Sequence, residues 1–164
     1  MHRHLFKAAL SAGVLLIMTS LASTSATAQD TNVKTTIVNP AGLYDPAPYG
    51  YSHAVVAEGG TRMAYLAGQG GEDRNGALSP TFADQVRQAY ANLRTALDAV
   101  GAGPHQVTRI TTYVVGYDPS MLDVMTQNVR EMFGDALPAQ TLVPVQRLAL
   151  DGMLFEVDAI AVLN

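Results

Sequence analysis

Hydrophobic residues recur at intervals of three and four along two stretches of the chain, the spacing that places them on one face of an α-helix. The first stripe comprises Phe82, Val86, Ala89, Tyr90, Leu93, Leu97 and Val100. It follows Ser79, Pro80 and Thr81 and stops at Gly101, the usual asymmetry of helix ends. The second stripe predicts a helix that ends at Gly134, and its members are Met121, Leu122, Met125, Val129, Met132 and Phe133.

Short runs of β-branched and aromatic residues surround these two helices. They span residues 52–57, 61–67, 107–115, 140–145 and 154–162, and each predicts a strand. Glycines at 59 and 60 separate the first two runs, which predicts that these two strands form a hairpin. Pro144 cannot donate a hydrogen bond to a neighbouring strand, so its strand is expected at the edge of a sheet or at a bulge.

The predicted order is β-β-α-β-α-β-β, with the strands gathered at both ends of the chain. This order favours the α+β class, with a mixed β-sheet covered on one face by two helices. The other face of the sheet is not strongly polar, which favours an oligomer that closes over it. Residues 29–50 are rich in Thr, Asn, Pro and Gly and are expected to form an irregular lead-in to a single domain over residues 51–164.

The first 28 residues have the pattern of a secretory signal peptide. Arg3 and Lys7 precede an apolar run over residues 8–21, and Ala26-Thr27-Ala28 offers the small residues that a signal peptidase requires. Cleavage after Ala28 would give a periplasmic or secreted protein that starts at Gln29 and has no further membrane association. The alternative, an uncleaved membrane anchor, is disfavoured because the apolar run is shorter than the ~20 residues that span a bilayer.

Charge and composition exclude several classes of function. The net charge is −4, and removing residues 1–28 takes away two basic and no acidic side chains, so the mature chain carries −6. A nucleic-acid partner is therefore not expected. The chain has no cysteine, which excludes disulfides, thiol catalysis and thiolate metal sites. The common hydrolase, metalloprotease and phosphate-binding motifs are also absent, so neither a metal nor a cofactor is expected.

A few polar positions could carry chemistry. Glu156 and Asp158 are two residues apart in the last predicted strand and so project to one side of the sheet. They would be a proton shuttle if burial raises a pKa, or an ordinary solvated face otherwise. The glycine-rich segment 68–76 is either a plain loop or part of a small-ligand site. His53 has a structural role or faces a cleft, and His105 is expected at the surface.

From residue 51 to 163 the chain resembles the Rid (YjgF/L-PSP) family of small enamine and imine deaminases. Residues 51–55 (YSHAV) are similar to the family's PYSQAV, and residues 66–69 (LAGQ) to its SGQ. The segment 88–101 matches a family helix, and residues 137–141 (LPAQT), 147–148 and 155–161 (FEVDAIA) continue the similarity in the same order. The resemblance implies a chorismate-mutase-like (YjgF-like) fold, assembled as a homotrimer with ligand clefts between subunits.

The resemblance also implies roles for individual residues. Asp158 occupies the position of the family's acidic residue that orients the hydrolytic water, and Tyr51 that of its cleft-lining tyrosine. The backbone of Gly68 would donate hydrogen bonds to the substrate. Gln140 stands where catalytic members carry an arginine that holds the substrate's carboxylate, and a neutral amide cannot supply that charge-assisted fork. Arg147 is a poor substitute because of its odd offset along the strand.

Two functions follow from these expectations. The first is an enzyme similar to 2-iminobutanoate/2-iminopropanoate deaminase, a hydrolase acting on a small molecule by imine deamination or related carbonyl chemistry, with Asp158 as the catalytic residue and Tyr51, Gly68 and Gln140 binding the substrate. The alternative is a non-catalytic trimer of the cell envelope that binds a small molecule or a partner protein in the same clefts. A ribonuclease is disfavoured by the net charge of the mature chain.

The signal-peptide prediction has a direct test. N-terminal sequencing of protein exported from an expressing bacterium should begin at Gln29. Recovery of a chain that still begins at Met1 from the membrane fraction would contradict it.

Overall fold

The computed structural model describes residues 32–164, so the predicted signal peptide over residues 1–28 and its cleavage site lie outside the described residues. The strands are β1 (Lys34–Val38), β2 (Ala54–Glu58), β3 (Arg62–Gly70), β4 (Val107–Val115), β5 (Ala139–Val145) and β6 (Phe155–Leu163). The helices are α1 (Phe82–Ala99) and α2 (Leu122–Phe133), and short 3-10 turns lie at Ala47–Tyr49, Pro104–Gln106 and Pro119–Met121.

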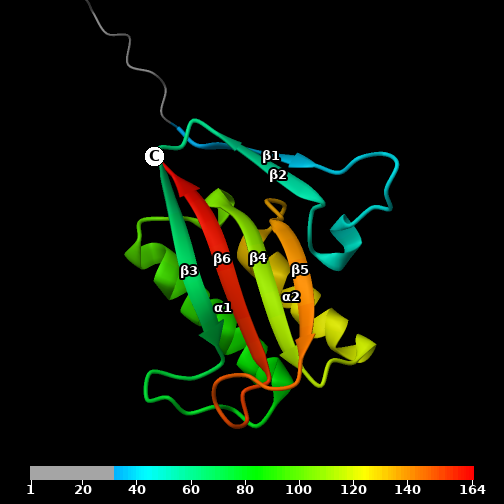
Figure 1. The fold of residues 1–164 in the computed structure, drawn as a ribbon, viewed down its shortest axis with the longest axis vertical. Coiled ribbons are helices and arrows are strands. Elements are labelled where there is room, and N and C mark those ends of the chain that lie inside the picture. Colours follow the sequence, from blue (N-terminus) through cyan, green and yellow to red (C-terminus); the bar gives the residue numbers. More distant parts are fainter. Residues whose placement is uncertain (1–31) are drawn as a thin grey trace, which may run out of the picture.

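Four strands form the main sheet in the order β3-β6-β4-β5. The β4–β5 pair is parallel, whereas β6 runs antiparallel to both of its neighbours. Figure 1 shows α1 and α2 together behind this sheet, with the other face of the sheet uncovered. The predicted α+β arrangement, a mixed sheet covered on one face by two helices, is therefore confirmed.

The core lies between the sheet and the helices, and β6 contributes to it with every second residue. Phe155, Val157, Ala159, Ala161 and Leu163 are buried, and the residues between them are only partly covered. Phe155 is fully buried, and its ring meets those of Phe82 and Tyr90 at centroid distances of 6.1 and 5.9 Å. The predicted stripe of α1 packs on this strand, with Val86, Ala89, Leu93 and Leu97 at 0% exposure.

Local signals explain where α1 begins and ends. Thr81 is the N-cap, and its side-chain oxygen accepts a hydrogen bond from the backbone N–H of Asp84. Gly101 follows the helix with φ +74°, a conformation that a residue with a side chain rarely adopts. Both ends match the sequence prediction to within two residues.

The predicted hairpin is wrong in its pairing. β2 pairs with β1 in a separate two-stranded antiparallel sheet, and the segment expected as an irregular lead-in, 29–50, contains β1 and a 3-10 turn. Lys34–Val38 has the sequence KTTIV, which suits a strand, but the surrounding prolines and glycines obscured it. Figure 1 shows this β1–β2 hairpin crossing the upper end of the main sheet.

The glycine-rich segment also differs from expectation. β3 continues to Gly70, so the predicted loop over 68–76 begins only after that residue. The register between β3 and β6 shifts between Leu66 and Gln69, which leaves residues 67 and 68 in a bulge. β5 is an edge strand, as Pro144 predicts. No helix within residues 32–164 is long and apolar enough to cross a membrane.

The packing around Phe155 yields a stability prediction. Phe155→Ala should lower the free energy of unfolding by about 3–5 kcal/mol, because it opens a cavity beneath two aromatic rings. Leu150→Ala is the control, because Leu150 is 45% exposed and should change stability by about 0.5 kcal/mol or less. Urea denaturation followed by circular dichroism measures both, and equal losses would contradict the placement of Phe155 in the core.

Candidate functional site

A cavity of about 220 Å³ opens beside β5, next to the segment that leads into β2. Its lining consists of Tyr49, Tyr51, Leu122, Gln140 and Leu142. Two of the residues that the sequence predicted to bind substrate, Tyr51 and Gln140, therefore lie together. The other three lining residues were not predicted, because nothing local in the sequence indicates that the 3-10 turn and the start of α2 meet β5.

Ser52 fixes the position of Tyr51 beside β5. Its backbone N–H donates to the carbonyl of Pro138 at 3.0 Å, and its hydroxyl donates to the carbonyl of Leu137 at 2.7 Å. Ser52 is only 1% exposed, so water does not compete for these two hydrogen bonds. The YSHAV segment thus ties its tyrosine to the strand that carries Gln140.

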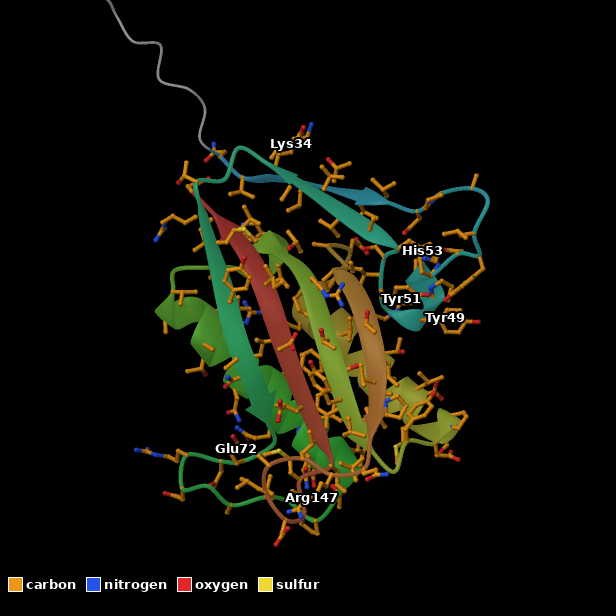
Figure 2. All side chains as sticks on the ribbon, in the orientation of Figure 1. Lys34, Tyr49, Tyr51, His53, Glu72 and Arg147 are labelled. Carbon is orange, nitrogen blue, oxygen red and sulfur yellow. The ribbon has the colours of Figure 1, made fainter. Side chains whose placement is uncertain are left out.

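Aromatic rings gather next to this cavity, and Figure 2 shows Tyr49, Tyr51 and His53 close to one another. Tyr44 meets each of these three rings edge to face, at centroid distances of 5.2–6.5 Å. The hydroxyls of Tyr44 and Tyr51 share a hydrogen bond. Partial burial, followed by this bond, raises the pKa of Tyr51 to about 12, so its phenol stays protonated at neutral pH and can donate.

The two histidines take the places that their surroundings dictate. The Nε2 atom of His53 lies 2.9 Å from the carbonyl oxygen of Tyr44, and its backbone N–H donates to Asn39 Oδ1 at 2.9 Å. His53 therefore has a structural role, tying the segment that contains Asn39 and Tyr44 to the start of β2. His105 is exposed, as predicted.

Gln140 has one end of its amide engaged within the protein. Its Nε2 donates to Thr112 Oγ1 at 3.3 Å, and Thr112 is fully buried. The other end, Oε1, is buried and has no hydrogen-bond partner. One end of the amide is tied to Thr112 whichever way the amide is turned, and the remaining hydrogen-bonding capacity of Gln140 is uncharged.

Asp158 lies on the uncovered face of the main sheet. Its Oδ1 accepts a hydrogen bond from the backbone N–H of Thr111 at 3.1 Å, and its Oδ2 accepts one from the Tyr113 hydroxyl at 3.0 Å. The bond to Asp158 is the main reason that the pKa of Tyr113 is raised, so this phenol remains a donor. The two bonds orient the carboxylate and leave each oxygen a free lone pair.

Glu156 lies on the same face, as the two-residue spacing predicted. Desolvation by burial, and then the negative charges of Glu72 and Asp158, raise the pKa of its carboxyl group. Its carboxylate packs on Gly68, where a Cβ atom would overlap it. The register pairs Leu66–Ala159 and Gln69–Val157 bracket Asp158, so the bulge that contains Gly68 lies opposite that residue.

The predicted site residues thus form two pairs on opposite faces of the sheet. Gln140 is in register with the buried Ile110 on the helix-covered face, whereas Asp158 is in register with Thr111 on the uncovered face. Tyr51 accompanies Gln140, and Gly68 accompanies Asp158. Arg147 lies at the other end of the sheet from Tyr51 and forms an exposed ion pair with Asp151 at 3.0 Å (Figure 2).

No three His, Asp or Glu side chains within residues 32–164 are arranged to hold a metal ion.

The fold and the two pairs of candidate site residues define a small α+β protein of the YjgF-like class. Residues 44–163 match the family model described as Endoribonuclease L-PSP, a stretch that covers most of the chain. The chain belongs to the Rid (YjgF/L-PSP) family.

Individual relatives agree with this assignment. RutC family protein PH0854 of Pyrococcus horikoshii is 34% identical over 119 residues, which cover 71% of this chain and 90% of the relative. The crystal structure of YyfB, a Rid-family protein of unknown function from Yersinia pestis, has a TM-score of 0.75 at 35% identity, over 79% of this chain and 98% of that one. The 2-iminobutanoate/2-iminopropanoate deaminase of Dermatophagoides farinae is 28% identical over 123 residues, 73% of this chain and 91% of the relative.

The raised pKa of Glu156 predicts how stability depends on pH. A carboxyl group whose pKa is higher in the folded than in the unfolded state favours folding when protonated, and this contribution is lost as the pH rises through the folded-state pKa. Glu156→Gln should therefore raise the urea midpoint at pH 7 and leave it nearly unchanged below the ordinary glutamate pKa of about 4.3.

Glu131→Gln is the matched control for this change, because Glu131 is exposed on α2 and bonded only to Gln127 in the same helix. Its midpoint should change little at either pH. A Glu156→Gln protein that is less stable than the native one at pH 7 would contradict the assigned pKa direction.

Proposed function

We propose that this protein is an exported Rid-family hydrolase that converts a small imine or enamine into a carbonyl compound and ammonia, in a cleft formed by two copies of the chain within a homotrimer. The observation that carries the proposal is Asp158, a carboxylate oriented by the Thr111 N–H and the Tyr113 hydroxyl on an uncovered sheet face. The deaminase from Dermatophagoides farinae, 28% identical over most of its length, gives the reaction class.

Asp158 can act as the general base for this reaction. A water molecule held by a free lone pair of Asp158 attacks the imine carbon and gives up a proton to the carboxylate, forming a carbinolamine. The nitrogen takes up two protons in turn, one that completes the carbinolamine and one that makes it a leaving group. The C–N bond then breaks, the carbinolamine hydroxyl loses its proton as the C=O bond forms, and ammonia leaves. The sum is one imine and one water consumed, and one carbonyl compound and one ammonia produced.

Glu156 can supply the proton to the leaving nitrogen. The pKa of Glu156 is raised by burial and by its acidic neighbours, so this group retains a proton at a higher pH than an ordinary glutamate. Two adjacent carboxyl groups in different environments are the usual way in which a site obtains both an acid and a base. In the proposal, Glu156 is the acid and Asp158 is the base.

The two faces of the sheet support a cleft between chains. Gln140 and Tyr51 lie on one side of the sheet and Asp158 and Gly68 on the other, so one chain cannot bring all four to one ligand. A second chain that packs on the uncovered face can bring its own Gln140 and Tyr51 to the same ligand as Asp158 and Gly68 of the first chain. Large apolar side chains on that face favour such contact: Tyr65 is 73% exposed and Met63 is 56% exposed.

The alternative function is a non-catalytic trimer that binds a small molecule in the same cleft. The observation that favours it is Gln140, a neutral amide that is partly engaged by Thr112, where a substrate carboxylate would need a charged fork. An endoribonuclease, the activity named in the description of the family model, is not proposed. The mature chain carries a net charge of −6, counted without residues 1–28, and repels phosphate.

The proposal is tested with the mature protein, residues 29–164, and freshly generated imines. We expect ammonia release from 2-iminopropionamide or 2-iminopropionate above the uncatalysed rate. Asp158→Asn keeps the shape of the side chain but removes the base, so the rate should fall by about 10²–10⁴-fold. A coupled assay with glutamate dehydrogenase measures the rate of ammonia release by the native protein and by Asp158→Asn.

Asp118→Asn is the matched control, because Asp118 caps the 3-10 turn at Pro119–Met121, is exposed and does not line the cavity. Its rate should remain that of the native protein. Light scattering should give a mass near three mature chains for all three proteins. A monomer would contradict the two-chain cleft, and a native protein that is inactive on both imines would leave the binding function as the better proposal.

A further inference from the structure

No charged side chain among residues 32–164 lines the cavity beside β5. Its five lining residues are two tyrosines, two leucines and one glutamine, namely Tyr49, Tyr51, Leu122, Leu142 and Gln140. At about 220 Å³, it accommodates only a small group. Moving an anion from water into such a lining is costly unless the site supplies a compensating charge.

The amide of Gln140 cannot compensate for a carboxylate. One of its ends is engaged by the buried hydroxyl of Thr112, the other end is itself buried, and neither carries a charge. A carboxylate has two oxygens and is held best by two parallel donors that carry a positive charge. A neutral amide or imine group, in contrast, can match one amide atom and one phenol without any change of charge.

The two arginines near Gln140 form hydrogen bonds with other parts of the protein. Arg130 on α2 donates to the carbonyl of Ala47. Arg109 lies on β4, one strand away from Gln140, but its guanidinium donates to Thr141 Oγ1 at 3.3 Å. Thr141 is in register with Thr111 and therefore lies on the uncovered face, opposite to the cavity.

The other half of the proposed cleft is acidic. Burial, and then the negative charges of Glu72 and Asp158, raise the pKa of Glu156, so these three carboxyl groups lie close together. A substrate that carried its own carboxylate would be repelled by this group of carboxylates, while a neutral imine that becomes protonated on nitrogen would be attracted to it.

We infer that the substrate of this site is an uncharged imine or enamine that lacks a carboxylate, and that Gln140 selects it over an amino-acid-derived imine. The inference rests on the proposed cleft and deepens the proposed function by naming the substrate class. Pyruvamide and pyruvate are suitable probes, because they differ only in a carboxamide against a carboxylate and are the carbonyl products of the two imines.

Isothermal titration calorimetry on the mature protein tests the inference. The native protein should bind pyruvamide at least about tenfold more tightly than pyruvate, a ratio within the range that one hydrogen bond to a charged group provides. Gln140→Arg should reverse the order, because the guanidinium supplies the fork that a carboxylate requires. Gln127→Arg adds the same charge at an exposed position of α2 and should keep the native order.

Further variants keep the test decisive. If Gln140→Arg does not fold, Gln140→Leu should weaken pyruvamide binding without improving pyruvate binding. A native protein that binds pyruvate as tightly as pyruvamide, or that binds neither, overturns the inference. Loss of pyruvate binding in Arg109→Gln would identify Arg109 as an anion anchor and would also overturn it.

The outcomes separate this inference from the proposed reaction. A clear preference for pyruvamide without any ammonia release from either imine would support the inference on the ligand and contradict hydrolysis. Hydrolysis of 2-iminopropionate at least as fast as that of 2-iminopropionamide would support the reaction and overturn the inference.

Discussion

The alternation of side chains along β6 is the constraint on which both the core and the candidate site depend. Phe155, Val157 and Ala159 face the helices, while Glu156 and Asp158 face the other way. A slip of one residue against β3 and β4 would exchange the two sets and drive two carboxylates into the core. The same register of β6 therefore buries the apolar side chains in the core and places Glu156 and Asp158 on the uncovered face. A change of register would alter both.

The elements that follow a local periodicity were predictable from the sequence. The stripe from Phe82 to Leu97 and the capping Thr81 give α1, and Pro144 places β5 at an edge. The pairing of β2 was not predictable, because its partner is chosen by non-local contacts. Both Lys34–Val38 and the segment after Gly60 could pair with β2, and no short-range signal in the sequence decides between these two partners.

The sequence named candidate site residues but not their arrangement in space. The resemblance to the Rid family named Tyr51, Gly68, Gln140 and Asp158, yet their division between two faces follows from the register of β4 with β5 and β6. The hydrogen bond from Tyr113 to Asp158 depends on the same register. Sequence spacing determines which residues of one strand share a face, but it does not say which residues of another strand join them.

Pro144 has a consequence for how the protein behaves at high concentration. An edge strand offers unpaired backbone groups to any passing chain, and this is a common route to fibrils. β5 is such an edge, and a proline at an edge has its missing N–H on the solvent side. An added strand would find no donor at that point of the ladder, so Pro144 makes β5 a poor template for aggregation even when many copies of the chain are crowded together.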